Sequence, residues 1–201
     1  TGGHLPLVLV GHGLFGTGEG MLDSGTARSL FYPLVDEVGA VGIATDWIGL
    51  SGGDLQLIQD EVLPDIANVR LVTDRLVQSH ANALALVELA LGALQADPAF
   101  DRQTDEPLLD PEAVYYYGIS LGGIQGASQV SLSPRISRAV LAVPGAGWAH
   151  MIQRSTQFQP LQGLIDGLYP DPLTQNLFLA ALQTFFDRSD PATVGALLPG
   201  D

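Results

Sequence analysis

Residues 114–130 read VYYYGISLGGIQGASQV, and this stretch decides the fold. Residues 114–117 are β-branched or aromatic, which is typical of a strand. Residues 121–129 are suited to a helix, which the Ser-Pro pair at 133–134 brings to an end. Two glycines, Gly118 and Gly122, flank the junction between the two elements. The stretch therefore predicts a strand that turns sharply into a helix.

Short apolar runs elsewhere have the length of buried parallel strands and alternate with helical patterns. The predicted strands span residues 5–10, 40–45, 114–117 and 138–143, and the predicted helices span residues 26–38, 64–94 and 121–129. Residues 11–20 are expected to form a loop and residues 97–111 a polar connection. This alternation predicts an α/β fold with a mostly parallel sheet flanked by helices.

The final quarter of the sequence changes character. It has no clear strand pattern, and apolar helical patches fall at residues 161–168 and 173–186. We expect residues 1–145 to form the α/β core. Residues 146–201 are expected to form a helical, lid-like segment of the same domain.

The composition excludes several classes of partner. The 201 residues carry 22 acidic and 8 basic side chains, all arginines, for a formal net charge of −14. Such a chain has no broad cationic surface for nucleic acid or for anionic lipid. It contains no cysteine, which excludes disulfides, zinc–thiolate sites and a cysteine nucleophile. No apolar run is long enough to span a bilayer, and the oligomeric state cannot be derived.

The sequence Gly118-Ile119-Ser120-Leu121-Gly122 has the G-x-S-x-G form of a nucleophile elbow. In such an elbow the serine occupies a strained turn, and bulky residues two positions before and after it would collide. The serine then projects from the carboxyl edge of the sheet, where the helix N-terminus favours developing negative charge. Ser120 is our candidate nucleophile; its alternative role is a helix N-cap.

A second match to the same pattern occurs at residues 49–53, GLSGG. Its serine, Ser51, lies in a doubled-glycine turn, and no strand abuts the first glycine. Context therefore favours Ser120 over Ser51.

Gly11-His12-Gly13-Leu14 directly follows the first predicted strand. Acyl transfer needs backbone N–H groups aimed at the oxygen that becomes negative. Our candidates for these oxyanion donors are the amides of Leu14 and Leu121. His12 and Gly13 are expected to shape the loop, with His12 holding it through hydrogen bonds.

The same loop also satisfies the G-x-G-x-x-G pattern of dinucleotide-binding proteins, through Gly11, Gly13 and Gly16. Asp46, after the next strand, is the matching candidate for a ribose contact. Two features disfavour this reading: the glycine-rich residues after Gly16 oppose an immediate helix, and Asp46 is too distant in sequence. A dinucleotide-binding oxidoreductase is nevertheless a third hypothesis.

Three segments together resemble the α/β-hydrolase superfamily, and more narrowly bacterial lipases and esterases. They are VLVGHGLFGTGEG (8–20), ATDWIGLS (44–51) and YYYGISLGGIQG (115–126), and the resemblance covers about residues 5–145. It implies hydrolysis of small-molecule or lipid carboxylic esters through an acyl-enzyme on Ser120. It implies no metal and no cofactor. Related lipases are often exported, although no signal peptide is visible in this sequence.

The sequence departs from that family after the elbow. The expected chain order is serine, then acid, then histidine. His150 is the only later histidine and comes too early, and Asp187, Asp190 and Asp201 follow no identifiable strand. We therefore expect a fragment whose acid and base lie beyond Asp201, and weak or absent ester hydrolysis by this chain alone. A non-catalytic hydrolase fold used for binding is the main alternative.

Overall fold

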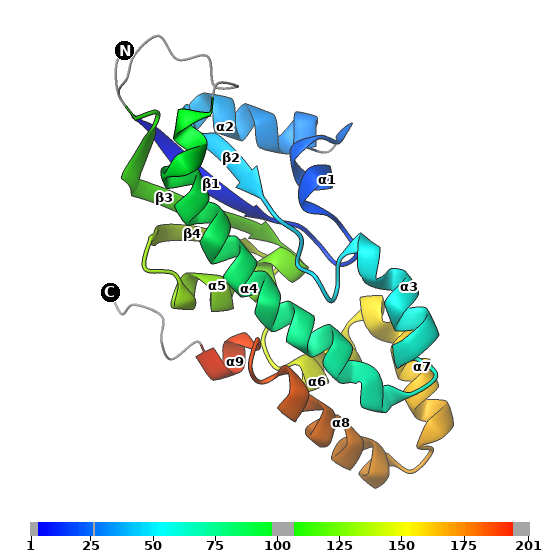
Figure 1. Cartoon of the computed structure of the whole chain (residues 1–201). Coiled ribbons are helices and arrows are strands. Elements are labelled where there is room, and N and C mark those ends of the chain that lie inside the picture. Colours follow the sequence, from blue (N-terminus) through cyan, green and yellow to red (C-terminus); the bar gives the residue numbers. More distant parts are fainter. Residues whose placement is uncertain (1–3, 26, 98–106, 195–201) are drawn as a thin grey trace.

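The computed structural model describes residues 4–25, 27–97 and 107–194 (Figure 1). Four strands within these residues form one sheet in the order β2-β1-β3-β4, and all pair in parallel. They are β1 Leu5–Gly11, β2 Val41–Ala44, β3 Leu109–Ile119 and β4 Ile136–Ala142. Leu9 pairs with Ile43 on one side and with Tyr116 on the other. The predicted α/β class is confirmed.

Helices surround this sheet. The α-helices are α1 Gly18–Leu22, α2 Tyr32–Val38, α3 Leu55–Leu57, α4 Arg70–Leu91, α5 Leu121–Leu132, α6 Trp148–Arg154, α7 Gln159–Leu168, α8 Pro172–Phe186 and α9 Pro191–Val194. Shorter 3₁₀ segments are Gly52–Asp54, Ile66–Val69, Ala93–Ala96 and Thr156–Phe158. Two π-helical turns are Ala27–Phe31 and Ile58–Val62. No helix within the described ranges is both long and apolar enough to cross a membrane.

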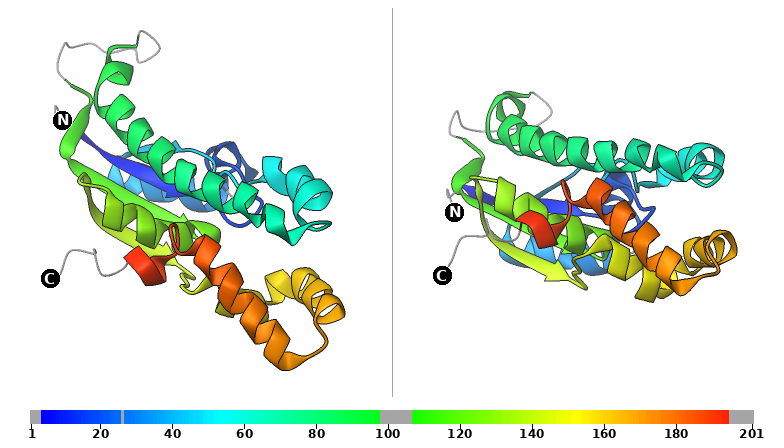
Figure 2. Two further views of the ribbon diagram at one scale, coloured as in Figure 1. Left: turned by 60° about the horizontal axis from the view of Figure 1, so that its bottom comes forward. Right: turned by 90° about the horizontal axis from the view of Figure 1, so that it is seen from below.

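Alternation along β3 assigns the helices to the two faces of the sheet. Tyr116 is buried against α5, where an ideal Cβ on Gly126 would overlap the tyrosine ring. The next residue, Tyr117, points to the other face and stacks on Phe31, with ring centroids 6.4 Å apart. Successive side chains of a strand point to opposite faces, so this pair of neighbours fixes both layers. Figure 2 shows α4 and α2 on opposite sides of the sheet.

The long helix α4 supplies much of the core. Its buried side chains include Val72, Leu76, Ala83 and Val87, which recur at intervals of four and seven positions. This spacing places them on one stripe facing the sheet. The stripe packs against apolar residues such as Leu7 and Leu9 of β1 in a single continuous core.

Helices α6 to α8 gather beyond the carboxyl ends of the strands (Figure 1). The connection after α8 is joined to the core by a 2.9 Å hydrogen bond from Ser128 Oγ to the Ser189 carbonyl. An ion pair of 2.9 Å links Arg188 to Asp74 of α4. All four described strands precede residue 145, and residues 148–194 contain helices and their connections but no strand. A domain boundary at 145 stays a prediction.

The structure corrects three predicted elements. Helix α1 begins inside the expected 11–20 loop, because Thr17 Oγ1 and the Asp46 carboxylate accept its first N–H groups and offset the low helix propensity of glycine. The expected helix 26–38 is divided into a π-helical turn and α2. Strand β3 begins at Leu109, within the expected polar connection. Pro111 fits there because it lies in an irregular stretch between the Leu5–Leu109 and Leu7–Val114 pairs.

Candidate functional site

Ser120 occupies the turn between β3 and α5. Its backbone has φ 56° and ψ −116°, a conformation that non-glycine residues avoid because it is strained. The turn is held by the Ser120 N–H, which donates to the Ala142 carbonyl at 3.0 Å, and by the Ile124 N–H, which donates to the Ser120 carbonyl at 2.9 Å. The side chain is half-buried, and its hydroxyl makes no hydrogen bond to the described part of the chain. The strain therefore presents a free hydroxyl at the end of the central strand.

Glycines flank Ser120 because the backbones approach too closely for a side chain. An ideal Cβ on Gly118 would overlap the Gly122 carbonyl group. An ideal Cβ on Gly122 would overlap the Gly11 carbonyl group and lie 2.9 Å from Gly11 Cα. The motif thus packs the N-terminus of α5 directly onto the end of β1. Tyr116 Oη, buried beneath the turn, donates to the Gly122 carbonyl at 2.6 Å, and burial raises the pKa of that phenol.

The loop after β1 lies beside Ser120. The ideal Cβ position of Gly13 is 3.6 Å from Ser120 Cβ and 4.0 Å from Ser120 Oγ. In the same loop the Phe15 N–H donates to the Leu50 carbonyl and the Gly16 N–H to the Gly13 carbonyl, each at 2.9 Å. The structure therefore brings this loop and the elbow together.

The amides of Leu14 and Leu121 are the two proposed oxyanion donors. Within residues 4–25, 27–97 and 107–194, neither N–H donates to a protein acceptor. Leu121 is the first residue of α5, where N–H groups lack intrahelical partners. Leu14 directly follows Gly13, whose ideal Cβ position is 3.6 Å from Ser120 Cβ. Both N–H groups therefore have no acceptor within the described part of the protein.

His12 has both ring nitrogens engaged by the backbone. Nδ1 lies 2.8 Å from the Gly13 carbonyl oxygen, and Nε2 accepts the Trp47 N–H at 2.8 Å. These partners require a neutral ring protonated on Nδ1. Burial lowers the pKa of His12 below its ordinary value of 6.5. The side chain ties the loop after β1 to the segment after β2 and has no nitrogen left to act as a base.

Ser51, in the second G-x-S-x-G match, has a different environment. It is buried, and its hydroxyl donates to the Asp54 carboxylate at 2.6 Å. The same carboxylate oxygen accepts the N–H groups of Gly49 and Ser51, and Asp54 also pairs with Arg75 at 3.0 Å. These contacts form a capping box at the start of the segment before α3. Ser51 is engaged in holding this turn.

The dinucleotide hypothesis finds no matching helix. Thr17 separates Gly16 from α1, which has only five residues. The Asp46 carboxylate, the candidate ribose ligand, accepts the Gly18 N–H at 2.7 Å and thereby caps that helix. Gly11 and Gly13 lie at the elbow instead, against Gly122 and Ser120.

Among the described residues, none of the candidate acids and bases hydrogen-bonds to Ser120. His150 is exposed on α6, and its Nδ1 lies 3.1 Å from an Arg154 guanidinium nitrogen. Asp190 is fully buried, and its carboxylate accepts four hydrogen bonds, three from backbone amides and one from Gln183. Asp187 accepts a hydrogen bond from the same glutamine at 2.9 Å. Asp201 lies outside the described residues.

The part of the chain that the structure describes contains no group of three or more His, Asp or Glu side chains that could hold a metal. The two tryptophans differ in position. Trp47 is buried in the core against His80, with ring centroids 5.4 Å apart. Trp148 lines a cavity of about 570 Å³ that Leu14 and Phe15 also line.

Much of this cavity was missed by sequence reasoning. Its far wall comes from residues 55–72. The sequence pattern predicts a helix only from residue 64 and no element over residues 55–63. The apolar spacing of Leu55, Ile58 and Val62 was the available signal, because residues three and four apart share one helical face.

Comparison with known proteins identifies a solved structure with a similar fold. No protein-family model matches the sequence, and no curated protein matches it. The structure is similar to the crystal structure of acetyl xylan esterase 1 from Thermoanaerobacterium sp. JW/SL YS485, with a TM-score of 0.56 and 17% sequence identity. The match covers 100% of this chain and 59% of that esterase, so this chain spans less than two thirds of its length. At this identity the likeness establishes a shared fold.

Proposed function

We propose that this chain is the core of a serine hydrolase that acts on carboxylic esters. Ser120 is the nucleophile, and the amides of Leu14 and Leu121 stabilise the oxyanion. The observation that carries the proposal is the strained Ser120 backbone, φ 56°, beside the Gly13 loop. Strain of this kind persists where the surrounding structure imposes it, and it is concentrated at functional sites. The fold shared with an esterase is consistent with this assignment.

In the proposed reaction Ser120 Oγ attacks the ester carbonyl carbon as a base removes the hydroxyl proton. The C=O electron pair moves onto the oxygen, which accepts the Leu14 and Leu121 N–H groups. The oxyanion collapses, the C–O bond to the alcohol breaks, and the alcohol leaves with the proton. Water then cleaves the acyl-enzyme by the same steps, which releases the acid and restores Ser120.

This reaction requires a base beside the Ser120 hydroxyl. No described side chain that could act as that base is hydrogen-bonded to Ser120. We propose that a histidine and its acid partner come from outside those residues and join the sheet beside β4. Among the strands that the structure describes, β4 pairs with β3 alone, and Val140 on it is 59% exposed. The open edge and the exposed apolar side chain suit a further strand. The chain of residues 1–201 alone is then expected to turn over esters weakly or not at all.

Covalent labelling tests the nucleophile without full turnover. The chain is incubated with an excess of an activated alkyl phosphonate, with and without added imidazole as an external base, and adducts are mapped by peptide mass spectrometry. We expect an adduct on Ser120 that imidazole accelerates and that Ser120→Ala abolishes.

The matched control is Ser51→Ala, because Ser51 lies in the other G-x-S-x-G sequence. This variant should retain the adduct. An adduct that persists in Ser120→Ala, or no adduct on Ser120 under either condition, contradicts the assignment. The second outcome would favour a hydrolase fold that binds without catalysis.

A further inference from the structure

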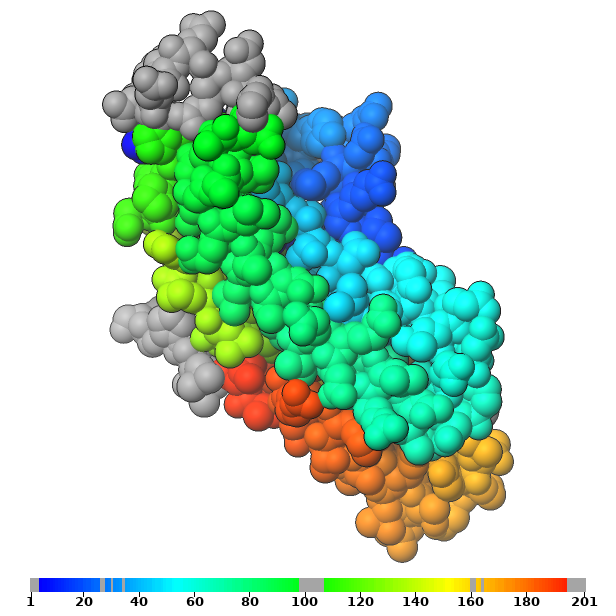
Figure 3. Space-filling view, viewed as in Figure 1, coloured from blue at the N-terminus to red at the C-terminus, as the bar shows by residue number. Residues whose placement is uncertain are grey.

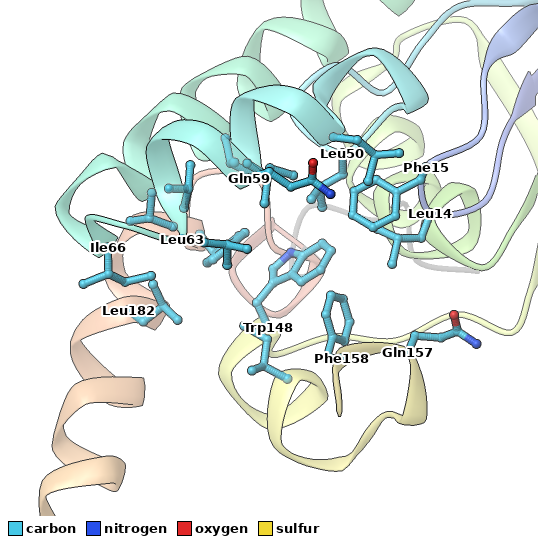
Figure 4. Close-up of a pocket in the computed structure, with 17 residues that line it drawn as sticks. Leu14, Phe15, Leu50, Gln59, Leu63, Ile66, Trp148, Gln157, Phe158 and Leu182 are labelled. Carbon is cyan, nitrogen blue, oxygen red and sulfur yellow. The ribbon is translucent and has the colours of Figure 1, made fainter. Parts of the chain in front are cut away.

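An apolar cavity adjoins the proposed oxyanion loop (Figure 4). Its volume is about 570 Å³, within the usual range of pockets for small organic ligands. Leu14 and Phe15 line one end of it. The remaining wall comes from Leu50, from the segment between Leu55 and Val72, and from the helical segment that begins at Trp148. In Figure 3 these two segments lie against each other at the same end of the molecule.

The aromatic part of the wall is built from rings that support one another. Trp148 stacks on Phe186, with ring centroids 5.0 Å apart and an interplanar angle of 25°. It meets Phe158 edge-on, with centroids 6.0 Å apart. The Asp190 carboxylate accepts a hydrogen bond from the backbone N–H of Trp148 at 2.8 Å and so fixes the start of α6. This aromatic part of the wall is therefore held in place from behind.

The chemistry of the wall is almost wholly that of hydrocarbon. Of the seventeen lining residues, two carry amide side chains, Gln59 and Gln157, and none is charged. One further donor, the indole N–H of Trp148, is buried without a hydrogen-bond partner in the described residues. So few polar groups can pair with only a few of the many hydroxyls of a sugar, and a hydroxyl buried against this wall without a partner is costly. An alkyl chain makes no such demand.

We infer that this cavity binds an unbranched hydrocarbon chain of the ester, longer than an acetyl group. The inference deepens the proposed function and rests on it for the link to catalysis. Leu14 provides that link, because its amide is one of the two proposed oxyanion donors and its side chain also lines the cavity. An ester with its carbonyl oxygen at Leu14 therefore has the cavity immediately beside it.

Binding is measured first, with no hydrolysis involved. The Ser120→Ala variant is titrated calorimetrically with acetate, butyrate, hexanoate and octanoate. We expect affinity to rise about fourfold for each added methylene until the chain fills the cavity. Equal affinity for acetate and octanoate would overturn the inference. Binding of xylose oligosaccharides in place of octanoate would overturn it as well.

Two substitutions with opposite expected effects link this affinity to the cavity. Leu63→Asp places a charge in the wall and should remove the gain with chain length, whereas Gln59→Leu removes an amide and should increase octanoate affinity. The matched control is Leu173→Asp, since Leu173 is 67% exposed and lies outside the cavity. General damage to the fold cannot explain a gain in Gln59→Leu. If neither cavity substitution changes the affinity for octanoate, the inference is refuted.

Labelling rates then identify which side of the ester enters the cavity. One phosphonate series lengthens the alkyl group on phosphorus, which stands for the acyl chain, and another lengthens the alkoxy group, which stands for the alcohol. One series should label Ser120 faster with length and the other should not. Ser120 labelling without any chain-length effect would refute this inference and leave the nucleophile intact. Octanoate binding without any Ser120 labelling would contradict the proposed function and leave the cavity assignment intact.

Discussion

Replacing Gly122 with alanine tests the steric argument for the elbow. The added Cβ would overlap the Gly11 carbonyl group and lie 2.9 Å from Gly11 Cα. All of these atoms belong to the backbone of β1, which hydrogen-bonds to a strand on each side and cannot rotate away. The N-terminus of α5 must therefore move, and with it Ser120.

The expected loss in the free energy of unfolding follows from the backbone atoms that must move. Overpacking a well-filled core costs roughly 1–3 kcal/mol, and an overlap with backbone belongs at the upper end. For a domain of this size a loss of about 3 kcal/mol lowers Tm by roughly 6–12 °C. Thermal and urea unfolding followed by circular dichroism measure the change, and phosphonate labelling of Ser120 should slow as well.

Gly163→Ala is the control, because nothing lies within 4 Å of its ideal Cβ and Gly163 is exposed in α7. That substitution should leave stability unchanged or raise it by about 0.5–1 kcal/mol, since alanine favours helix over glycine. If Gly122→Ala unfolds within about 1 kcal/mol of the unsubstituted chain and labels at the same rate, the steric reasoning is wrong.

Two further predictions concern buried polar groups. Asp190→Ala leaves three backbone amides and the Gln183 side chain without their acceptor, so we expect a loss of roughly 3 kcal/mol by urea unfolding; a loss below 1 kcal/mol would contradict the capping role. Burial lowers the pKa of both His12 and His80 from the ordinary 6.5. The unfolded chain then binds more protons below about pH 6.5, so stability is full above that pH and falls as pH decreases, by up to about 1.4 kcal/mol per unit for each histidine. Urea unfolding at several pH values should show this slope, and His80→Gln should reduce it; an unchanged slope would exclude His80 as a cause.

The strands were predictable from the sequence because each is a short apolar run with its own turn signals. The run at residues 5–10 and the aromatic run at 114–117 both became central strands. Their type depends on local pattern, which a sequence displays directly. The meeting of the Gly13 loop with Ser120 was also accessible, since the carboxyl ends of parallel strands share one edge.

Features that depend on distant partners were not predictable. Helix α1 forms within a glycine-rich stretch because Asp46, which follows another strand, caps it. Asp190, a candidate catalytic acid by its place in the sequence, instead accepts the backbone N–H of Trp148 and so caps α6. Trp148 lies forty-two residues earlier in the chain. The cavity likewise requires residues from two segments that only tertiary folding brings together.

In the proposed reaction Ser120 attacks a carbonyl carbon, and the amides of Leu14 and Leu121 hold the oxygen bonded to that carbon. A crystal structure of the phosphonate adduct measures this directly. We predict a phosphoryl oxygen at about 2.7–3.1 Å from both amide nitrogens, with the alkyl chain directed into the cavity. A phosphoryl oxygen that faces solvent or other donors, with both amides unoccupied, would contradict this prediction.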